Sequence, residues 1–538
     1  MSKYARIAST LALAGGIALG TGLAAEAQTP KKGGTLTFIV AAEAPSYDMH
    51  KESTFAVVHP IAPFYSLLIR VNPENPQSPT DFVCDLCVGK VPAPTDGGKT
   101  YTFKIKKGVK FHDGQVLTAK DVVASMNKII FPPEGVVSVR KAFYKMVESV
   151  TAPDDETVVF KLKYATGSFL PALATPMNSI YSAKDLKEKG MDWHEKNVNG
   201  TGPFKFKEAV AGSHVDGVRF DDYHIKGQPY LDGFRGLISR KLAVRVQAIR
   251  ADRAAIEFRG FPPAQRDELV KALGKDITVQ ESDWNCVLLY TPNQGREVAQ
   301  DPRVRQALTL AVDRWGGSQH LSKIAIVKSV GGVAFPNHPL AATKEELHKL
   351  NGYMPDLKAS REKAKALLKE AGKSNLKFEL MNRGTDQPYK IVGTWLIGQW
   401  RQIGVEVTQR VEETKAFYDS LRKTKDFDVS LDFNCQSVVN PIVDVSKFLG
   451  SAGNNYGNYK GKDDELEAIY DKLATEGDEK KQYELMRTFE KRAISDQAHL
   501  AITLWWYKIN PHRSYVKGWK IAPSHYLNQQ LDNVWLDK

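Results

Sequence analysis

The sequence predicts an α/β protein whose lobes are built from discontinuous segments of the chain. Strand patterns and helix patterns alternate over most of its 538 residues, an order that is typical of α/β folds. A strand pattern also returns late, over residues 500–505, after a long helical stretch. Because a chain of this length exceeds what one hydrophobic core supports, we expect two or three packed domains.

The first half of the chain shows three strands and one well-marked helix. Thr35–Val40 is an apolar run that follows two glycines, and residues 101–109 alternate between apolar and polar side chains. Both patterns predict strands, the second half-buried. Thr118 then begins a helix, because Asp121 three residues later completes a capping box. Residues 156–162 predict the third strand.

The second half contains three helices and three strands. Asp301 begins a helix at Pro302, since Asp accepts free backbone N–H groups and Pro needs no partner in the first turn. Helices over residues 360–371 and 391–403 are each followed by a glycine, the usual residue after a helix end. The strands are expected at residues 405–407, 427–433 and 500–505.

Composition excludes several classes of protein. With 42% hydrophobic and 25% charged residues, the chain is too apolar to be disordered. Its mean hydropathy of −0.35 and the absence of a later apolar run of about 20 residues exclude a polytopic membrane protein. The net charge of +12 comes from 74 basic and 62 acidic residues spread along the chain. We interpret it as a basic surface bias and predict no nucleic-acid partner.

Residues 1–27 have the pattern of a secretory signal peptide. Lys3 and Arg6 precede an apolar stretch over residues 7–23, and Ala25 and Ala27 are the small residues that a signal peptidase reads. We expect cleavage after Ala27 and export to the periplasm. No cysteine stands at the cut, so we expect no lipoprotein anchor.

The four cysteines leave several alternatives open. Cys84 and Cys87 form a C-x-x-C pair that would also suit zinc or thiol exchange, whereas Cys286 and Cys435 are isolated. In an oxidising compartment, two disulfides are the simpler interpretation. We find no phosphate-binding loop, zinc-protease helix or nucleophile elbow. The sequence therefore predicts no enzyme activity, cofactor or metal site.

Six short stretches resemble the extracytoplasmic solute-binding proteins of family 5, the peptide- and nickel-binding components of ABC importers. The most specific is YTFKIKKGVKFHDGQVLTAKDVVAS at residues 101–125. The others follow in the family's order and extend nearly to the end of the chain: NGTGPF at 199–204, GQPYLD at 227–232, DPRVRQAL at 301–308 with Asp313 and Arg314, VKGW at 516–519 and VWLD at 534–537.

The resemblance implies a two-lobed periplasmic-binding-protein type II fold with an extra subdomain inserted in lobe 1. Lobe 1 is expected over residues 28–70, 200–286 and 507–538, the subdomain over 71–199 and lobe 2 over 287–506. Segments 284–292 and 504–507 would cross between the lobes as a hinge. Gly200 and Gly202 are expected to adopt positive φ in a tight turn. The implied partners are a small-molecule ligand and an inner-membrane permease with its ATPase subunits. We expect a monomer without a stable membrane anchor.

The resemblance also implies site residues and a disulfide pairing. Peptide-binding members carry an aspartate two residues after the cysteine that corresponds to Cys435, and it receives the peptide's amino terminus. Ser437 stands there, and a neutral hydroxyl does not offset the desolvation of an ammonium. Asp432 and Asp444 could substitute, but neither matches the motif. Arg383 lies near a carboxylate-binding arginine of dipeptide-binding members. The family pairing implies Cys286–Cys435, which leaves Cys84–Cys87.

Large aromatic side chains are more numerous near the expected crossing strands than a hydrophobic core usually requires. We expect two or three of them to line the pocket. The candidates are Trp284, Tyr290, Trp395, Trp400, Trp505 and Trp506. The sequence thus favours a binding protein for a small organic solute other than an ordinary free peptide. The alternatives are a peptide, a nickel chelate or, in a different class, an exported thiol-redox protein or enzyme.

Overall fold

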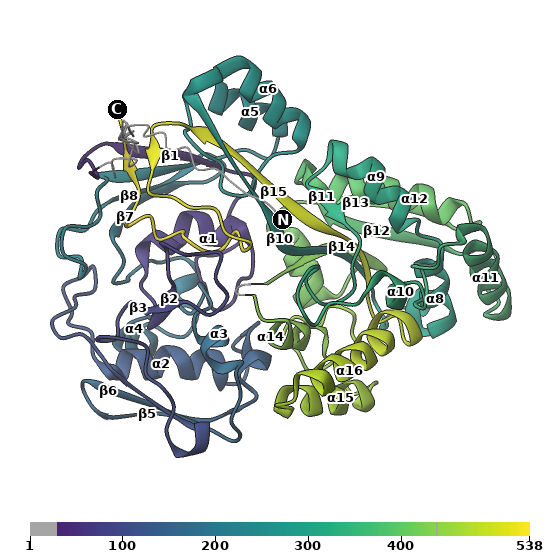
Figure 1. Ribbon diagram of the computed structural model, residues 1–538, viewed down its shortest axis with the longest axis horizontal. Coiled ribbons are helices and arrows are strands. Elements are labelled where there is room, and N and C mark those ends of the chain that lie inside the picture. The colour runs from purple at the N-terminus through teal and green to yellow at the C-terminus, as the bar shows by residue number, and fades with distance from the viewer. Residues whose placement is uncertain (1–28, 437–438) are drawn as a thin grey trace, which may run out of the picture.

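The protein folds into two α/β lobes that lie side by side, as the computed structural model shows (Figure 1). The structure describes residues 29–436 and 439–538. The predicted signal peptide with its cut after Ala27, and Ser437, lie outside the described residues.

Lobe 1 is built on a four-stranded sheet in the order β1-β9-β8-β7. Strand β1 runs parallel to β9, and the other neighbours are antiparallel. The strands are β1 (Thr35–Val40), β7 (Phe204–Val210), β8 (His214–Arg219) and β9 (Gly233–Ile238), and the helices of this lobe are α1 (Phe55–Ile61), α5 (Leu242–Arg250) and α6 (Pro263–Leu273).

The segment between the first and second parts of lobe 1 has a sheet and a hydrophobic core of its own. Its strands pair antiparallel in the order β4-β6-β5, beside the hairpin β2-β3. The elements are β2 (Ile69–Val71), β3 (Phe82–Cys84), β4 (Thr100–Lys104), β5 (Val147–Asp154), β6 (Thr157–Leu162), α2 (Ala119–Ile130), α3 (Phe169–Leu173) and α4 (Ala183–Glu188).

Lobe 2 is built on a six-stranded mixed sheet in the order β11-β15-β10-β14-β12-β13. Its strands are β10 (Ile277–Pro292), β11 (Val327–Ser329), β12 (Lys377–Arg383), β13 (Glu406–Glu412), β14 (Val429–Cys435) and β15 (Ala501–Arg513). Its helices are α7 (Glu297–Gln300), α8 (Pro302–Leu310), α9 (Arg314–Ile324), α10 (Lys344–Leu347), α11 (Leu357–Glu370), α12 (Ile391–Arg401), α13 (Thr414–Asp419), α14 (Pro441–Val445), α15 (Asp464–Thr475) and α16 (Glu479–Glu490). The chain then returns to lobe 1 and ends in the small pair β16 (Val516–Lys517) and β17 (Trp535–Leu536).

The two longest strands, β10 and β15, run from lobe 1 into the sheet of lobe 2 as an antiparallel pair (Figure 1). At one end β15 is bonded to lobe 1, where the N–H of Phe261 donates to the carbonyl of Ile509 at 2.8 Å. At the other end β10 pairs with β14. The β10-β15 register shifts between Asp283 and Val287, at the point where the pair enters lobe 2.

The helix starts predicted from caps match the structure, whereas the helix expected from residue 360 begins earlier, at Leu357, and the strand lengths differ. Thr118 forms the expected capping box with Asp121, and Asp301 accepts from the N–H of Arg303 at 2.8 Å. The strand expected over residues 101–109 ends at Lys104, because the chain turns at Gly108, which has a φ of 72°. The last strand is longer than expected, since β10 pairs with it as far as Arg513.

The expectation of positive φ at Gly200 and Gly202 is wrong. Neither glycine lies in the left-handed region. Both lack room for a side chain instead, because an added Cβ would collide with the backbone of Phe64 or Tyr65. These glycines allow the close approach of two backbone segments in lobe 1.

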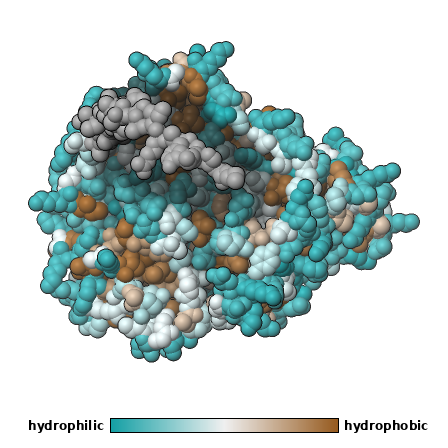
Figure 2. Space-filling model, viewed as in Figure 1, coloured by the Kyte–Doolittle hydropathy of each residue, from teal (hydrophilic) through white to brown (hydrophobic). Residues whose placement is uncertain are grey.

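Among the described residues, none of the helices combines the length and apolar character that a membrane crossing needs. On the face shown in Figure 2, hydrophilic residues cover the outer rim and hydrophobic ones appear in separate patches. Most apolar side chains gather instead in buried cores, one that extends through both lobes and one that lies mainly in lobe 2.

Both predicted disulfides are present. Cys84 is bonded to Cys87, and Cys286 is bonded to Cys435 across a sequence separation of 149 residues. The second bond joins partners in register on β10 and β14. It therefore fixes the end of β14 to a strand that crosses between the lobes.

We predict that the two disulfides differ in their contribution to stability. In the chain-entropy model, replacing Cys286 and Cys435 by Ser costs about 3–5 kcal/mol, because the bond closes a long loop. Replacing Cys84 and Cys87 by Ser costs less than about 2 kcal/mol, since that loop is very short. Urea unfolding of the two double variants measures the difference. Equal losses of unfolding free energy would contradict this assignment.

Candidate ligand-binding site between the lobes

A small cavity of about 30 Å³ lies where β14 of lobe 2 faces lobe 1 and the segment of residues 71–199 inserted in it. A second space adjoins it and shares Asp432, Phe433 and Asn434 of β14. Both lobes contribute to the wall of the first cavity: Ser53, Val139, Arg140, Phe143, Met177 and Tyr526 on one side, and Tyr418, Asp432, Phe433, Asn434, Cys435, Lys447, Asn454 and Tyr456 on the other.

Asp432 places a carboxylate in this cavity. It lies on β14 opposite Leu289 of β10, and it is buried. Its Oδ1 has no hydrogen-bond partner among the described residues. Burial raises the pKa of Asp432 to about 6, although Arg383 acts in the opposite direction. The cavity therefore contains a carboxyl with one unpartnered oxygen, on which the backbone of Phe433 and the hydroxyl of Tyr418 also act.

Arg383 ends strand β12 and reaches across the lobe interface. Its guanidinium is fully buried and donates to the hydroxyls of Thr414 at 3.2 Å and of Thr54, in lobe 1, at 3.3 Å. Its Nε has no partner among the described residues. The guanidinium carbon also lies 5.2–5.8 Å from the centres of four aromatic rings: Phe55, Tyr389, Tyr418 and Phe433.

Several polar contacts hold the lobes together around the cavity. Arg422 of lobe 2 forms an ion pair with Glu52 of lobe 1 at 2.9 Å, and both side chains are largely buried. On the outside, Lys145 of the inserted segment pairs with Glu467 of lobe 2 at 2.9 Å. The structure is therefore a closed arrangement, in which the two lobes contact each other over the site.

Of the predicted aromatic residues, Trp506 lies nearest to the site. It packs edge-on against Trp284, with ring centres 4.9 Å apart, and lies 5.9 Å from Phe433, which lines the cavity. Its indole N–H is buried and has no partner among the described residues.

The other predicted aromatics have protein partners elsewhere. Trp505 donates to the carbonyl of Gly332 at 3.0 Å within the core of lobe 2. Tyr290 packs against Trp400 behind the sheet, with ring centres 5.1 Å apart. Trp395 lies on α12 and faces Gly317 of α9. Like Trp284, Trp506 and Arg383, these residues do not line the two cavity spaces, so the role of all of them in binding stays a prediction.

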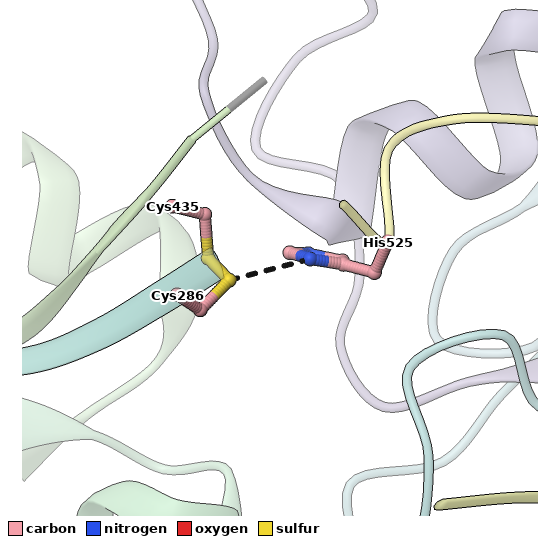
Figure 3. Close-up of side chains that lie close together, drawn as sticks. All are labelled: Cys286, Cys435 and His525. Carbon is pink, nitrogen blue, oxygen red and sulfur yellow. Dashed lines mark hydrogen bonds between the residues drawn. A yellow bond between two sulfur atoms is a disulfide. The ribbon is translucent and has the colours of Figure 1, made fainter. Parts of the chain in front are cut away.

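The Cys286–Cys435 disulfide faces the ring of His525 on the C-terminal segment (Figure 3). Nδ1 of His525 lies 3.4 Å from Sγ of Cys286 and accepts the indole N–H of Trp284 at 2.9 Å. Burial lowers the pKa of His525 well below its usual value, so the imidazole is neutral. Since the two sulfurs are bonded to each other, this group of side chains is a structural contact and not a metal site.

Sequence reasoning missed several residues of the interface. Tyr418, Tyr526 and Arg140 line the cavity, and Arg259 lies beside Trp506. No motif or periodicity marks them, because they come from four separate segments that only the folded chain brings together. For Arg383, the resemblance alone predicts a contact with the ligand.

Comparison with known proteins gives one family match. The model for "Bacterial extracellular solute-binding proteins, family 5 Middle" matches residues 90–456. The oligopeptide-binding protein AppA of Bacillus subtilis is 31% identical over 357 residues, which span 62% of each chain. The dipeptide-binding protein of Escherichia coli is 27% identical over 475 residues, which span 81% of this chain and 84% of that protein.

Solved structures confirm the two-lobed fold. Helicobacter pylori DppA in complex with the peptide STSA superimposes with a TM-score of 0.80 at 22% identity, over 94% of this chain and 99% of that one. AgaA of Agrobacterium tumefaciens in complex with agropinic acid gives a TM-score of 0.81 at 20% identity, over 94% and 99%. At these identities the likeness concerns the fold and not the ligand.

We predict that Asp432 makes the unfolding free energy depend on pH. Because its folded-state pKa of about 6 is higher than its ordinary value of 3.8, the folded protein holds this proton more tightly than the unfolded chain. The resulting stability is complete below pH 3.8 and is lost as the pH rises through 6. Asp432→Asn should therefore gain up to about 3 kcal/mol over the wild type between pH 4 and 7.

Urea unfolding at several pH values measures this gain. Asp426→Asn is the control, since that carboxylate lies on the surface with a side chain 64% exposed. Parallel pH profiles for Asp432→Asn and the wild type would show that Asp432 does not titrate in this range.

Proposed function

The chain belongs to the bacterial extracellular solute-binding proteins of family 5, and from this premise we propose that it is the periplasmic substrate-binding component of an ABC importer. It captures a small organic solute between its lobes and delivers it, as a monomer, to a membrane permease with its ATPase subunits. The proposal includes removal of residues 1–27 on export. In this role the protein binds and releases its solute without covalent chemistry.

We further propose that the solute is an anion or neutral compound with an apolar or aromatic body. The observation that carries this proposal is Arg383, a buried guanidinium surrounded by aromatic rings with no carboxylate within 4.0 Å among the described residues. An oxyanion of the solute would accept its free N–H, and the rings would supply the apolar contact area. Ser437, where peptide-binding members carry an aspartate, supports the same choice.

A second candidate is a free peptide, and Asp432 is the observation that favours it. An ionised Asp432 in the cavity is able to receive an ammonium group in place of the missing aspartate. The matched relatives include proteins described as oligopeptide-, dipeptide- and heme-binding, so family membership does not select between solutes. The two candidates differ in one group, the ammonium of the ligand.

Calorimetry with two matched panels, N-acetyl amino acids and unmodified dipeptides, tests the proposal. We expect the wild type to bind members of the first panel more tightly. Arg383→Met should weaken that binding by ten- to a hundredfold, which corresponds to about 1.5–3 kcal/mol for one charge-assisted hydrogen bond. The amides of the same N-acetyl amino acids are the control, since they lack the charge and should be little affected by the variant.

Tighter binding of dipeptides than of N-acetyl amino acids would favour the second candidate, a free peptide. Tight binding of unmodified dipeptides by the wild type, lost in Asp432→Asn, would show that Asp432 replaces the missing aspartate. Ser437→Asp should weaken the binding of N-acetyl amino acids and increase that of dipeptides.

A further inference from the structure

A second buried arginine, Arg259, reaches the lobe interface from lobe 1. It lies in the loop before α6, and its Nη1 donates to the carbonyl of Gln387 in lobe 2 at 2.6 Å. Its Nε and Nη2 are buried and have no hydrogen-bond partner among the described residues. No carboxylate of the described chain lies within ion-pair distance of it. Arg259 is thus a cation with free donors at the interface.

Arg259 and Arg383 lie against the same two aromatic rings. The guanidinium carbon of Arg259 is 4.4 Å from the centre of Phe55 and 5.6 Å from that of Tyr389. The corresponding distances for Arg383 are 5.2 and 5.4 Å. Trp506 adds its ring, 4.9 Å from Arg259, and its unpartnered indole N–H. Two cations from opposite lobes therefore share one aromatic enclosure.

Acidic groups act on these two arginines from a distance, but none forms an ion pair with either of them among the described residues. Glu257 is the buried carboxylate closest in sequence to Arg259, and it lies 3.9 Å from Arg245. Asp432 is the acid whose charge acts on Arg383. Lys508 is a further buried cation that interacts with Glu257. Three carboxylates, Glu257, Asp386 and Asp432, thus face Arg245, Arg259, Arg383 and Lys508, and burial lowers the pKa of Lys508 to about 7.

Unbonded guanidinium donors also occur at Arg70, Arg245 and Arg422, but each of these arginines has a carboxylate within 4.0 Å. Arg314 is equally buried, and its guanidinium donates to the carbonyls of Ile502, Thr309 and Gly352 and to the hydroxyl of Thr309. Burying a charge without such partners costs several kcal/mol. Arg259 and Arg383 are both buried in this way at the lobe interface, where a bound anion would offset the cost.

We propose that Arg259 and Arg383 form a two-lobe clamp for the oxyanion of the solute. The proposal rests on the proposed function and adds a second specificity-determining residue to it. Each lobe supplies one guanidinium, so the oxyanion is held fully only when the lobes meet. In the absence of the oxyanion, closure brings two positively charged guanidinium groups together. A bound oxyanion offsets their repulsion. A neutral solute of the same shape therefore does not stabilise the closed form to the same extent.

Sulfate is the probe for the clamp, because it offers oxyanion acceptors without an organic body. The melting temperature is measured against sulfate concentration, with sodium chloride at equal ionic strength as reference, for the wild type, Arg259→Met, Arg383→Met and the double variant. Arg303→Met, on the surface of α8, controls for the general stabilisation by sulfate.

We expect a saturable sulfate shift in the wild type and in Arg303→Met. Arg259→Met and Arg383→Met should each raise the half-saturating sulfate concentration at least tenfold. The double variant should raise it little further than either single variant. Without sulfate, Arg259→Met should melt no lower than the wild type, because it removes an unpaired buried charge. If Arg259→Met does not fold, Arg259→Gln and Arg259→Lys provide the same comparison.

Two results would overturn the clamp. One is the absence of a saturable sulfate shift in the wild type. The other is a lower melting temperature of Arg259→Met with an unchanged sulfate shift, which would make Arg259 a structural residue. The proposed solute class is tested separately from the clamp. If the clamp binds sulfate but the protein prefers dipeptides, the clamp is supported and the solute class is rejected. If N-acetyl amino acids bind and only Arg383→Met weakens them, the solute class is supported and the clamp is rejected.

Discussion

The antiparallel pairing of β10 with β15 is the constraint on which the binding site depends. Both strands are bonded to lobe 1 at one end and are central strands of the lobe 2 sheet at the other (Figure 1). Any motion between the lobes has to pass through this pair, and the register shift after Asp283 is where its hydrogen bonding is interrupted. The Cys286–Cys435 bond follows directly and ties β14 to the pair. The cavity wall on β14 therefore moves as part of lobe 2.

Electrostatics at the interface favours a charged partner. Most ion pairs between described residues lie at the surface, where they contribute little to stability. Between the lobes the situation differs, because Arg259 and Arg383 are removed from water without a carboxylate within ion-pair distance. Burial raises the pKa of Asp432, which precedes Phe433 on β14, to about 6. A solute with an oxyanion at one end and a hydrogen-bond donor at the other would satisfy both groups.

The sequence predicted local features well and tertiary ones poorly. Helix starts at Thr118 and Asp301 were predictable because a cap acts within three residues. The end of β15 was not, since its length depends on pairing with β10, which is distant in sequence. For the same reason the sequence did not separate Trp506, near the site, from Trp505, whose side chain points into the core of lobe 2. Adjacent residues of a strand face opposite sides, and only the sheet order identifies the side that faces lobe 1.

The central claim is that the lobes close over an organic oxyanion. Native mass spectrometry of the protein freshly purified from the periplasm tests it most directly, because a closed binding protein retains its ligand. The account predicts a retained small molecule with a carboxylate or other oxyanion and no free ammonium group, released on denaturation and absent from the Arg383→Met variant. A retained mixture of free peptides, present equally in that variant, would contradict it.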